Sequence, residues 1–401
     1  MTFRATGVFN ELSYLLFILA GVVVFHLLPV RWRPYWLALI GTLFYAYYAR
    51  IFLLLVAVEI VFIWALTREI RQQKWMFLGA LAVALGALAY FKYRNMALLT
   101  GAGLAGLVGW DVTPRLGQLV LPLAISFFTF EFVHYVVDCR KGMIGEHKLV
   151  DFLAFAMFFP TMVAGPIKRF QDFQPRVAQA RLTPDNLSAG VSRIVTGLFR
   201  KVVVADTMEY FCRHLENTYQ VQIMSTLGLW VALGAYTIRI YMDFAGYSDI
   251  AIGSARLFGI KVPENFLQPY FKPNIAEFWK AWHVSLYRWI VDYVFIPLGG
   301  SRGTTRRTIL NTLIAMSASG LWHGAAWNFV LWGFYHGLLL SGYRLFRSSK
   351  HALQPKSRAG RLAVVGLSTA LTFFLVSLGW LPFVMPIDRL AIALPKMFGL
   401  R

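Results

Sequence analysis

Charged residues and cysteines are scarce in this sequence. Asp, Glu, Lys and Arg make up 14% of the 401 residues, whereas a soluble domain averages about 25%. Such a shortage argues against a globular fold in water, because large apolar areas would be left exposed. Only Cys139 and Cys212 occur, with no CxxC pair. A disulfide scaffold and a cysteine-rich metal site are therefore excluded.

Acidic residues are scarcer still, since 19 Asp and Glu face 39 Lys and Arg, giving a net charge of +20. Such an excess can mark a nucleic-acid-binding protein, but no nucleic-acid-binding motif accompanies it. The cations lie in short loops between apolar runs, which is the positive-inside pattern of membrane proteins. We therefore predict no nucleic-acid partner and place loops 31–34, 68–74 and 344–361 in the cytoplasm. A basic face of this kind also suits acidic lipids, an acidic carrier protein or a phosphorylated cofactor, and the alternative is a solvated face without a function.

Several catalytic signatures are missing or lie outside their usual context. The sequence contains no HExxH or P-loop motif. GxGxxG and GxSxG patterns occur at 101–106 and 299–303, but neither follows a predicted strand, which is the context that each motif needs. These signals therefore argue against a zinc protease and an ATP-driven pump, and they give no support to a serine hydrolase or a dinucleotide-dependent enzyme.

Long apolar runs are plentiful, and hydrophobic residues make up 58% of the chain. A membrane-spanning helix needs about 20 predominantly apolar residues. The sequence therefore predicts an all-α polytopic membrane protein, a single domain over 1–401 with roughly ten to thirteen membrane segments. The candidate segments are 12–30, 35–49, 51–67, 75–91, 96–110, 117–137, 150–166, 188–206, 224–243, 243–258, 283–298, 308–322, 325–346 and 362–381.

Two regions differ from plain spanning helices. Segment 150–166 is short, ends in Gly-Pro and has basic residues on both sides, which predicts a re-entrant segment or a helix inside a funnel. Region 299–346 also has basic residues at both ends, which predicts a hairpin. Helix 308–322 would rise about 22 Å and place His323 deep in the membrane. Irregular backbone at that depth is tolerated where it lines a wet cavity.

Four histidines, His134, His283, His323 and His336, lie in contexts with other polar groups. Imidazole is the side chain that removes protons near neutral pH, with an unperturbed pKa of about 6.5. In SGLWHGAAWNFVLWGFYHG (319–337), His323 is the candidate general base, and Trp322 and Asn328 are candidates for positioning a substrate. The alternative is a core histidine with a satisfied hydrogen bond and side chains that only anchor the helix.

Segment 269–300 combines cations with aromatic rings, including Lys272, Trp282, His283 and Arg288. One interpretation is a membrane-interface belt. The other is a polar mouth that receives an anionic or thioester substrate. In YMDFAGYSDIAIG (241–253), by contrast, the two aspartates are six residues apart, about 240° around a helix. We therefore predict a structural use of this motif, with its glycines allowing close helix contact.

At five motifs the chain resembles the membrane-bound O-acyltransferase family, in its bacterial branch that modifies cell-surface polymers. The matching motifs lie between about 120 and 340 and are SFFTFEFVHYVVD, FFPTMVAGPIKRFQDF, YMDFAGYSDIAIG, the block from Glu264 to Gly300, and SGLWHGAAWNFVLWGFYHG. The resemblance implies a funnel-shaped helical body with a central tunnel. It also implies that His323 and His283 are catalytic. Trp322, Asn328, Lys272, Trp282, Arg288 and His336 are the expected substrate-binding residues, and no metal is expected.

The resemblance further implies a cytoplasmic acyl thioester as donor, either acetyl-CoA or the phosphopantetheine arm of an acyl or D-alanyl carrier protein. Its members sit in the bacterial inner membrane as multi-pass proteins, in contact with membrane lipid, and act with an extracytoplasmic serine-esterase-like (SGNH) partner. The pair Lys280-Ala281 before Trp282 departs from the alginate type, so D-alanyl transfer remains open. A lipid-modifying acyltransferase and a non-enzymatic transporter or channel are further alternatives.

Overall fold

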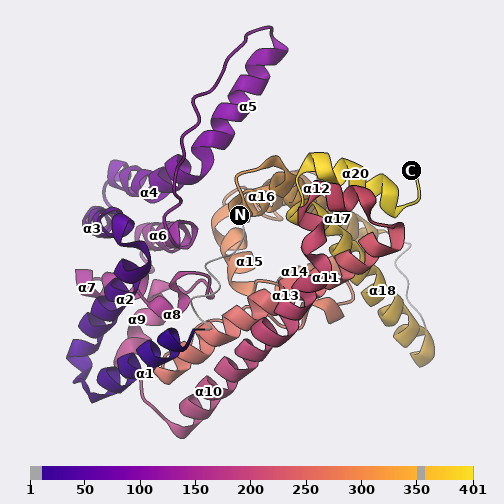
Figure 1. Cartoon of the computed structure of the whole chain (residues 1–401). Helices are drawn as coiled ribbons and strands as arrows, with labels where there is room; N and C mark the ends of the chain where they lie inside the picture. The colour runs from indigo at the N-terminus through magenta and orange to yellow at the C-terminus, as the bar shows by residue number, and fades with distance from the viewer. Residues whose placement is uncertain (1–10, 350–356, 401) are drawn as a thin grey trace. The chain divides into compact units, whose positions relative to one another are not determined.

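Helices dominate the chain in a computed structural model that describes residues 11–349 and 357–400 (Figure 1). Those two stretches contain no β-strand. In lipid, every backbone N–H and C=O needs a partner within the protein, and a helix supplies these partners within a single segment. The apolar composition and the helical structure therefore agree, and the predicted all-α membrane fold is confirmed.

The chain packs as two compact units. One comprises Met1–Thr196 and Tyr247–Pro263, and the other comprises Gly197–Gly246 and Glu264–Arg401. Helix α13 (Thr226–Leu257) contributes residues to both. The single domain expected over 1–401 stays a prediction.

In the first unit, helices follow the apolar runs of the sequence. They are α1 (Leu12–Leu27), α2 (Arg33–Ala49), α3 (Leu53–Thr67), α4 (Lys74–Leu88), α5 (Arg94–Leu107), α6 (Ile125–Arg140), α7 (Leu149–Ala156), α8 (Phe159–Met162), α9 (Phe170–Gln179) and most of α10 (Pro184–Leu198). Every run predicted before residue 111 is confirmed as a helix.

The helix predicted over 117–137 is wrong at its start. Residues 111–122 have no regular secondary structure, and α6 begins only at Ile125. Pro122 lacks a backbone N–H, and its ring strongly disfavours a position in a helix interior. Ala124, just before the helix, has a left-handed backbone with φ of 60°. The prediction therefore began the helix too early, because it gave the apolar residues of this stretch more weight than its proline.

The two segments predicted at 224–243 and 243–258 are one helix of 32 residues, α13. Its aspartates are ion-paired, Asp243 with Lys201 at 2.9 Å and Asp249 with Arg193. The two glycines of the motif 241–253, Gly246 and Gly253, lie against other backbone, since a Cβ at Gly253 would be 2.6 Å from a carbonyl oxygen of α10. The predicted structural use of this motif is confirmed.

Segment 150–166 is not a continuous helix. α7 covers 8 residues and α8 only 4, so α7 rises about 12 Å, far less than a hydrocarbon core of about 30 Å. Nearby, Lys168 pairs with Glu131 at 2.5 Å and His134 contacts Asp138 at 3.3 Å. All four of these side chains are buried. The prediction that this region is no plain spanning helix is confirmed.

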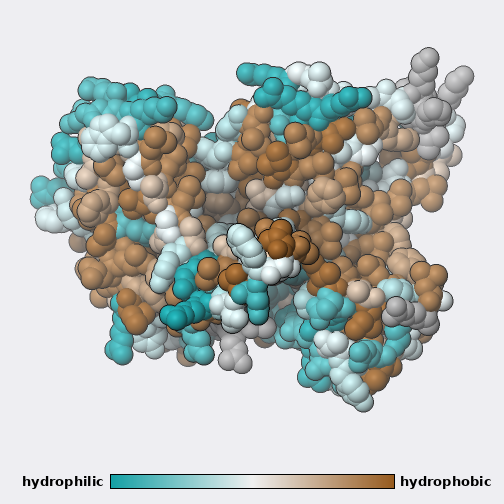
Figure 2. All heavy atoms as spheres, turned by 90° about the horizontal axis from the view of Figure 1, so that it is seen from above, coloured by the Kyte–Doolittle hydropathy of each residue, from teal (hydrophilic) through white to brown (hydrophobic). Residues whose placement is uncertain are grey.

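Three helical stretches of the described residues are long and apolar enough to cross a membrane, Val30–Thr67, Lys74–Leu107 and Arg358–Val384. Many of their large apolar side chains are exposed, as with Leu54 at 75% and Leu367 at 72%. Hydrophobic residues also cover much of the face drawn in Figure 2. Lipid is the solvent that accepts such a surface. The full number of membrane segments stays a prediction, and residues 350–356 of the basic loop 344–361 lie outside the described residues.

The second unit carries the histidine-bearing motifs. Its helices include α11 (Asp206–Cys212), α12 (Thr218–Ile223), α14 (Ile275–Ala281), α15 (Val284–Ile290), α16 (Thr305–His323), α17 (Trp327–Ser348), α18 (Arg358–Gly379), α19 (Leu381–Val384) and α20 (Ile387–Met397). Helices α16 and α17 share the most extensive packing of any pair and are joined by only three residues. The hairpin predicted within 299–346 is therefore confirmed, with its first helix beginning at Thr305 rather than 308.

Candidate active site

His323 is the last residue of α16, at the turn of the hairpin. The next residue, Gly324, has an extended backbone that ends the helix. Glycines let the two helices approach closely around this turn, since a Cβ at Gly320 would lie 2.1 Å from the carbonyl oxygen of Phe329. The sequence therefore builds a tight hairpin that holds an imidazole at its tip.

The His323 ring is half-buried among aromatic side chains. Its centroid lies 4.6 Å from that of Trp322, 5.0 Å from that of Trp332 and 5.0 Å from that of Phe383. These rings come from three elements, α16, α17 and α19, so the imidazole has apolar walls and a remaining accessible side. A proton acceptor in such a setting can reach a reactant while most water is kept away.

His283 lies between α14 and α15 and is 1% exposed. Its backbone is left-handed, with φ of 45°, a conformation that is unusual outside glycine and often marks functional positions. Its Nδ1 lies 3.0 Å from Oδ1 of Asn265. Its Nε2 is buried and has no hydrogen-bond partner among the described residues.

Trp322 links the two histidines. Its ring lies 6.0 Å from the His283 ring and 4.6 Å from the His323 ring. Two imidazoles from separate motifs therefore share one aromatic neighbour inside the second unit. A sequence separation of forty residues is closed by the fold.

The other expected substrate-binding residues occupy different surroundings. Trp282 is 3% exposed and packs 4.9 Å from Trp380, so it is part of the core. Asn328 donates from Nδ2 to the carbonyl oxygen of Pro382 at 3.0 Å. This bond ties α17 to α19 and thereby holds Phe383 beside His323. Both side chains are engaged with neighbouring residues of the protein, and direct substrate contact by either stays a prediction.

His336 lies one aromatic layer from His323. Trp332 separates them, with ring distances of 5.1 Å to His336 and 5.0 Å to His323. His336 is 0% exposed, and neither ring nitrogen has a hydrogen-bond partner among the described residues. Lys272 is half-buried after the 3-10 turn Pro269–Phe271, and Arg288 is exposed on α15. No described hydrogen bond or ring contact joins these two cations to the histidines.

Asn265 is a functional candidate that sequence reasoning missed. It is 1% exposed and contacts His283 from eighteen residues away in the chain. Its only signal in the sequence is its place near the start of the block that carries His283. Phe244 and Phe383 were also missed, and they line His283 and His323 at 4.6 and 5.0 Å. Aromatic residues are too common in this chain for sequence to single them out.

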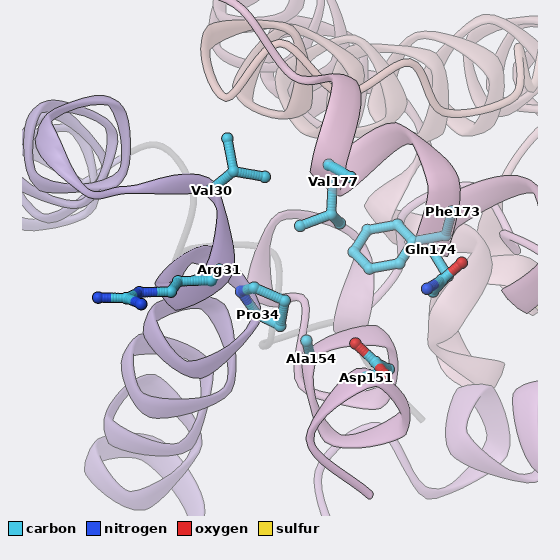
Figure 3. A pocket seen from close by; sticks show the side chains of 9 residues that line it. Val30, Arg31, Pro34, Asp151, Ala154, Phe173, Gln174 and Val177 are labelled. Carbon is cyan, nitrogen blue, oxygen red and sulfur yellow. The ribbon is translucent and has the colours of Figure 1, made fainter. Parts of the chain in front are cut away.

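Neither of two pockets has His283 or His323 among its lining residues. A cavity of about 210 Å³ in the first unit has Arg31 and Asp151 among its lining residues (Figure 3), and it contains none of the predicted site residues. A larger apolar groove of about 630 Å³ in the second unit lies between α13 and α18. Tyr270 lines that groove and stacks 5.8 Å from Trp282. Within the described residues, no cluster of three or more His, Cys, Asp or Glu is arranged to hold a metal ion.

The chain is similar to bacterial acyltransferases. The sequence model of the membrane-bound O-acyltransferase family matches residues 139–376. A probable alginate O-acetylase from Pseudomonas aeruginosa is 36% identical over 385 residues, covering 92% of this chain and 70% of the relative. A peptidoglycan O-acetyltransferase from Helicobacter pylori is 31% identical, covering 87% of this chain and 70% of the relative. A teichoic acid D-alanyltransferase from Bacillus subtilis is 30% identical, covering 66% of this chain and 69% of the relative.

Proposed function

The chain belongs to the membrane-bound O-acyltransferase family, and we propose that it takes an acetyl group from a cytoplasmic thioester for O-acetylation of an exported polysaccharide. Membership of the family makes it an O-acyltransferase and a membrane protein. Relatives named as alginate and peptidoglycan O-acetylating enzymes cover most of the chain and support the acetyl group. A transporter or channel function has no comparable support.

The proposed chemistry uses His323 as general base. Its neutral imidazole removes the proton of the acyl acceptor's hydroxyl, and the hydroxyl oxygen attacks the thioester carbonyl carbon. The tetrahedral intermediate collapses with cleavage of the carbon–sulfur bond. The thiolate then leaves and takes up the proton from the imidazolium. General-base assistance of this kind is typically worth about 10²–10⁴-fold.

The observation that carries this proposal is the pair of imidazoles held beside one indole ring. Trp322 contacts both His283 and His323, so a reactant bound near that ring meets two nitrogen bases at once. Pre-positioned groups of this kind lower the entropic cost of bringing reactants together. Our candidates for binding the reactants remain Trp322, Asn328, Lys272, Trp282, Arg288 and His336.

The acyl donor, the partner protein and the location in the inner membrane are parts of the same proposal. We propose acetyl-CoA as donor and a serine-esterase-like protein on the outer face as the recipient that delivers the acetyl group to the polymer. The enzyme then sits as a multi-pass protein in the bacterial inner membrane. Its basic loops would attract the CoA phosphates or an acidic carrier protein electrostatically.

The donor is tested with purified protein in liposomes. Acetyl-CoA labelled in the acetyl group, or a D-alanyl carrier protein labelled in the alanyl group, is supplied outside, with the acceptor polymer or the partner protein present. We expect acetyl-CoA to be consumed at least about tenfold faster than the D-alanyl thioester, since acetylating relatives match more of the chain. Transfer of labelled acetyl to a hydroxyl is measured as an alkali-labile ester.

D-alanyl transfer is the second candidate function. The observation that favours it is the similarity to teichoic acid D-alanyltransferases, at 30% identity for the Bacillus subtilis protein. Consumption of the D-alanyl thioester alone in the same experiment would replace the first proposal with this one. Reaction of neither donor, with both acceptors supplied, would contradict both.

A further inference from the structure

Three polar groups lie within hydrogen-bond distance of the side-chain oxygen of Asn265. The backbone N–H of Ser285 donates to it at 3.4 Å and the hydroxyl of Ser285 at 2.9 Å, and Nδ1 of His283 lies 3.0 Å away. A backbone N–H can only donate, so the amide atom that it meets must be oxygen rather than nitrogen. This contact resolves the usual ambiguity between the two ends of an asparagine amide.

That assignment fixes the proton on His283. Because Oδ1 of Asn265 can only accept, Nδ1 of His283 must carry the hydrogen of the shared bond. A neutral imidazole has one N–H, so Nε2 is then an unprotonated nitrogen with a lone pair. This Nε2 is buried and has no partner among the described residues. A buried polar atom left in this way calls for an explanation, such as a ligand atom.

The backbone around His283 holds the same arrangement in place. The backbone N–H of Val284 donates to the backbone carbonyl oxygen of Asn265 at 2.9 Å. The backbone N–H of Leu267 donates to the backbone carbonyl oxygen of Ala281, also at 2.9 Å. The left-handed φ of 45° at His283 is sparsely populated for residues other than glycine. These bonds keep the ring within reach of Asn265 despite that cost.

We propose that Asn265 is a positioning residue that holds His283 as its Nδ1–H tautomer, so that Nε2 accepts a hydrogen bond from a reactant. The inference rests on the proposed acyl transfer. It means that neutral His283 orients a reactant that carries an O–H or N–H group and does not donate to the acyl carbonyl oxygen. The O–H or N–H group that His283 binds is not the hydroxyl that His323 deprotonates, because that hydroxyl has only one hydrogen.

Two reactants could supply the group that His283 binds. The acceptor that receives the acyl group has further O–H or N–H groups beside the hydroxyl that is acylated, and the pantetheine arm of an acyl thioester has amide N–H groups. Both are hydrogen-bond donors and suit an unprotonated nitrogen equally well. The kinetics of variants distinguish them, because a raised KM appears for whichever reactant loses its bond.

The tautomer is read directly by solid-state nitrogen-15 NMR of the full chain in liposomes, with histidine as the only labelled residue type. Protonated and unprotonated ring nitrogens have well-separated shifts. The signal of His283 among the eight histidines is identified by its loss in His283→Gln. We expect Nδ1 protonated and Nε2 unprotonated in wild type. Protonated Nε2 with bare Nδ1 would overturn the proposal.

Variants of Asn265 separate positioning from a merely structural role. Asn265→Ala removes the acceptor for Nδ1–H, so protonated Nε2 should appear and turnover should fall about 10- to 100-fold, within the up to about 10⁴-fold cost of a wrong histidine tautomer. Asn265→Asp keeps an oxygen there and should restore the wild-type tautomer and most of the turnover. An Asn265→Asp protein with unprotonated Nδ1, or a folded Asn265→Ala protein with normal turnover, would contradict the proposal.

Asn311→Ala is the matched control. Asn311 is also a buried asparagine of the second unit, at 4% exposed, and its Nδ2 donates to the carbonyl oxygen of Gly300 at 3.0 Å. Its loss should lower the melting temperature without changing the His283 signal. If wild type transfers no acyl group but shows the Nδ1–H tautomer, the proposed function fails while the assignment of the proton stands.

Discussion

Replacing His323 by alanine should lower acyl transfer about 10²–10⁴-fold while the protein stays folded. Among the described residues of the hairpin turn, the imidazole is the one side chain able to take a proton from a hydroxyl near neutral pH. Without it, the hydroxyl must attack the thioester while still protonated or lose its proton to water. Acyl transfer by the His323→Gln variant should fall as far, because glutamine keeps much of the shape and polarity of histidine but is not a base.

The control for this prediction is His214→Ala. His214 lies in the 3-10 turn Arg213–Glu216 of the same unit, outside the aromatic cluster. Its removal makes the same chemical change and should leave turnover within about twofold, as for most substitutions away from a site. Turnover of His323→Ala close to wild type, at an unchanged melting temperature, would remove His323 from the chemistry.

Gly333→Ala should destabilise the hairpin that holds His323 and should lose activity with it. A Cβ at Gly333 would lie 2.1 Å from the carbonyl oxygen of Met316, and backbone cannot turn aside as a side chain can. The two helices must therefore separate. Overpacking of this kind costs about 1–3 kcal/mol, and a shift of about 1 Å in a catalytic group costs about 10²-fold in rate.

Gly342→Ala supplies the comparison on the same helix. Gly342 has nothing within 4 Å of the Cβ position, so alanine should be neutral or slightly stabilising through its better helix propensity. Melting temperature in detergent and turnover in liposomes are measured for both variants. Equal stability and activity of Gly333→Ala and Gly342→Ala would show that close contact between α16 and α17 does not hold the site.

Hydropathy predicted most of the fold because lipid leaves few options for a backbone. Runs such as 51–67 and 75–91 became helices, since apolar segments in a membrane must satisfy their own hydrogen bonds. Where the prediction was wrong, polar or special residues decided the outcome. Asp243 does not interrupt α13, because Lys201 pairs with it at 2.9 Å. Such a pairing joins residues far apart in sequence and is not visible in a hydropathy profile.

The site was predictable in its histidines and less so in their neighbours. The motifs pointed to His283 and His323, and the fold brings both to the ring of Trp322. Asn328 was expected to contact substrate, but its amide is engaged with the carbonyl oxygen of Pro382. Asn265 was not singled out, because its role depends on where its oxygen points. Residue type and spacing carry no information on that direction.

The most direct test of the account is the turnover of the double variant His283→Ala/His323→Ala, measured beside both single variants in liposomes. Residues that act in one reaction centre have strongly non-additive effects, whereas independent sites add in free energy. We predict that the double variant is no more than about threefold slower than His323→Ala alone. A double variant whose loss equals the product of the two single losses would contradict a single centre built from both histidines.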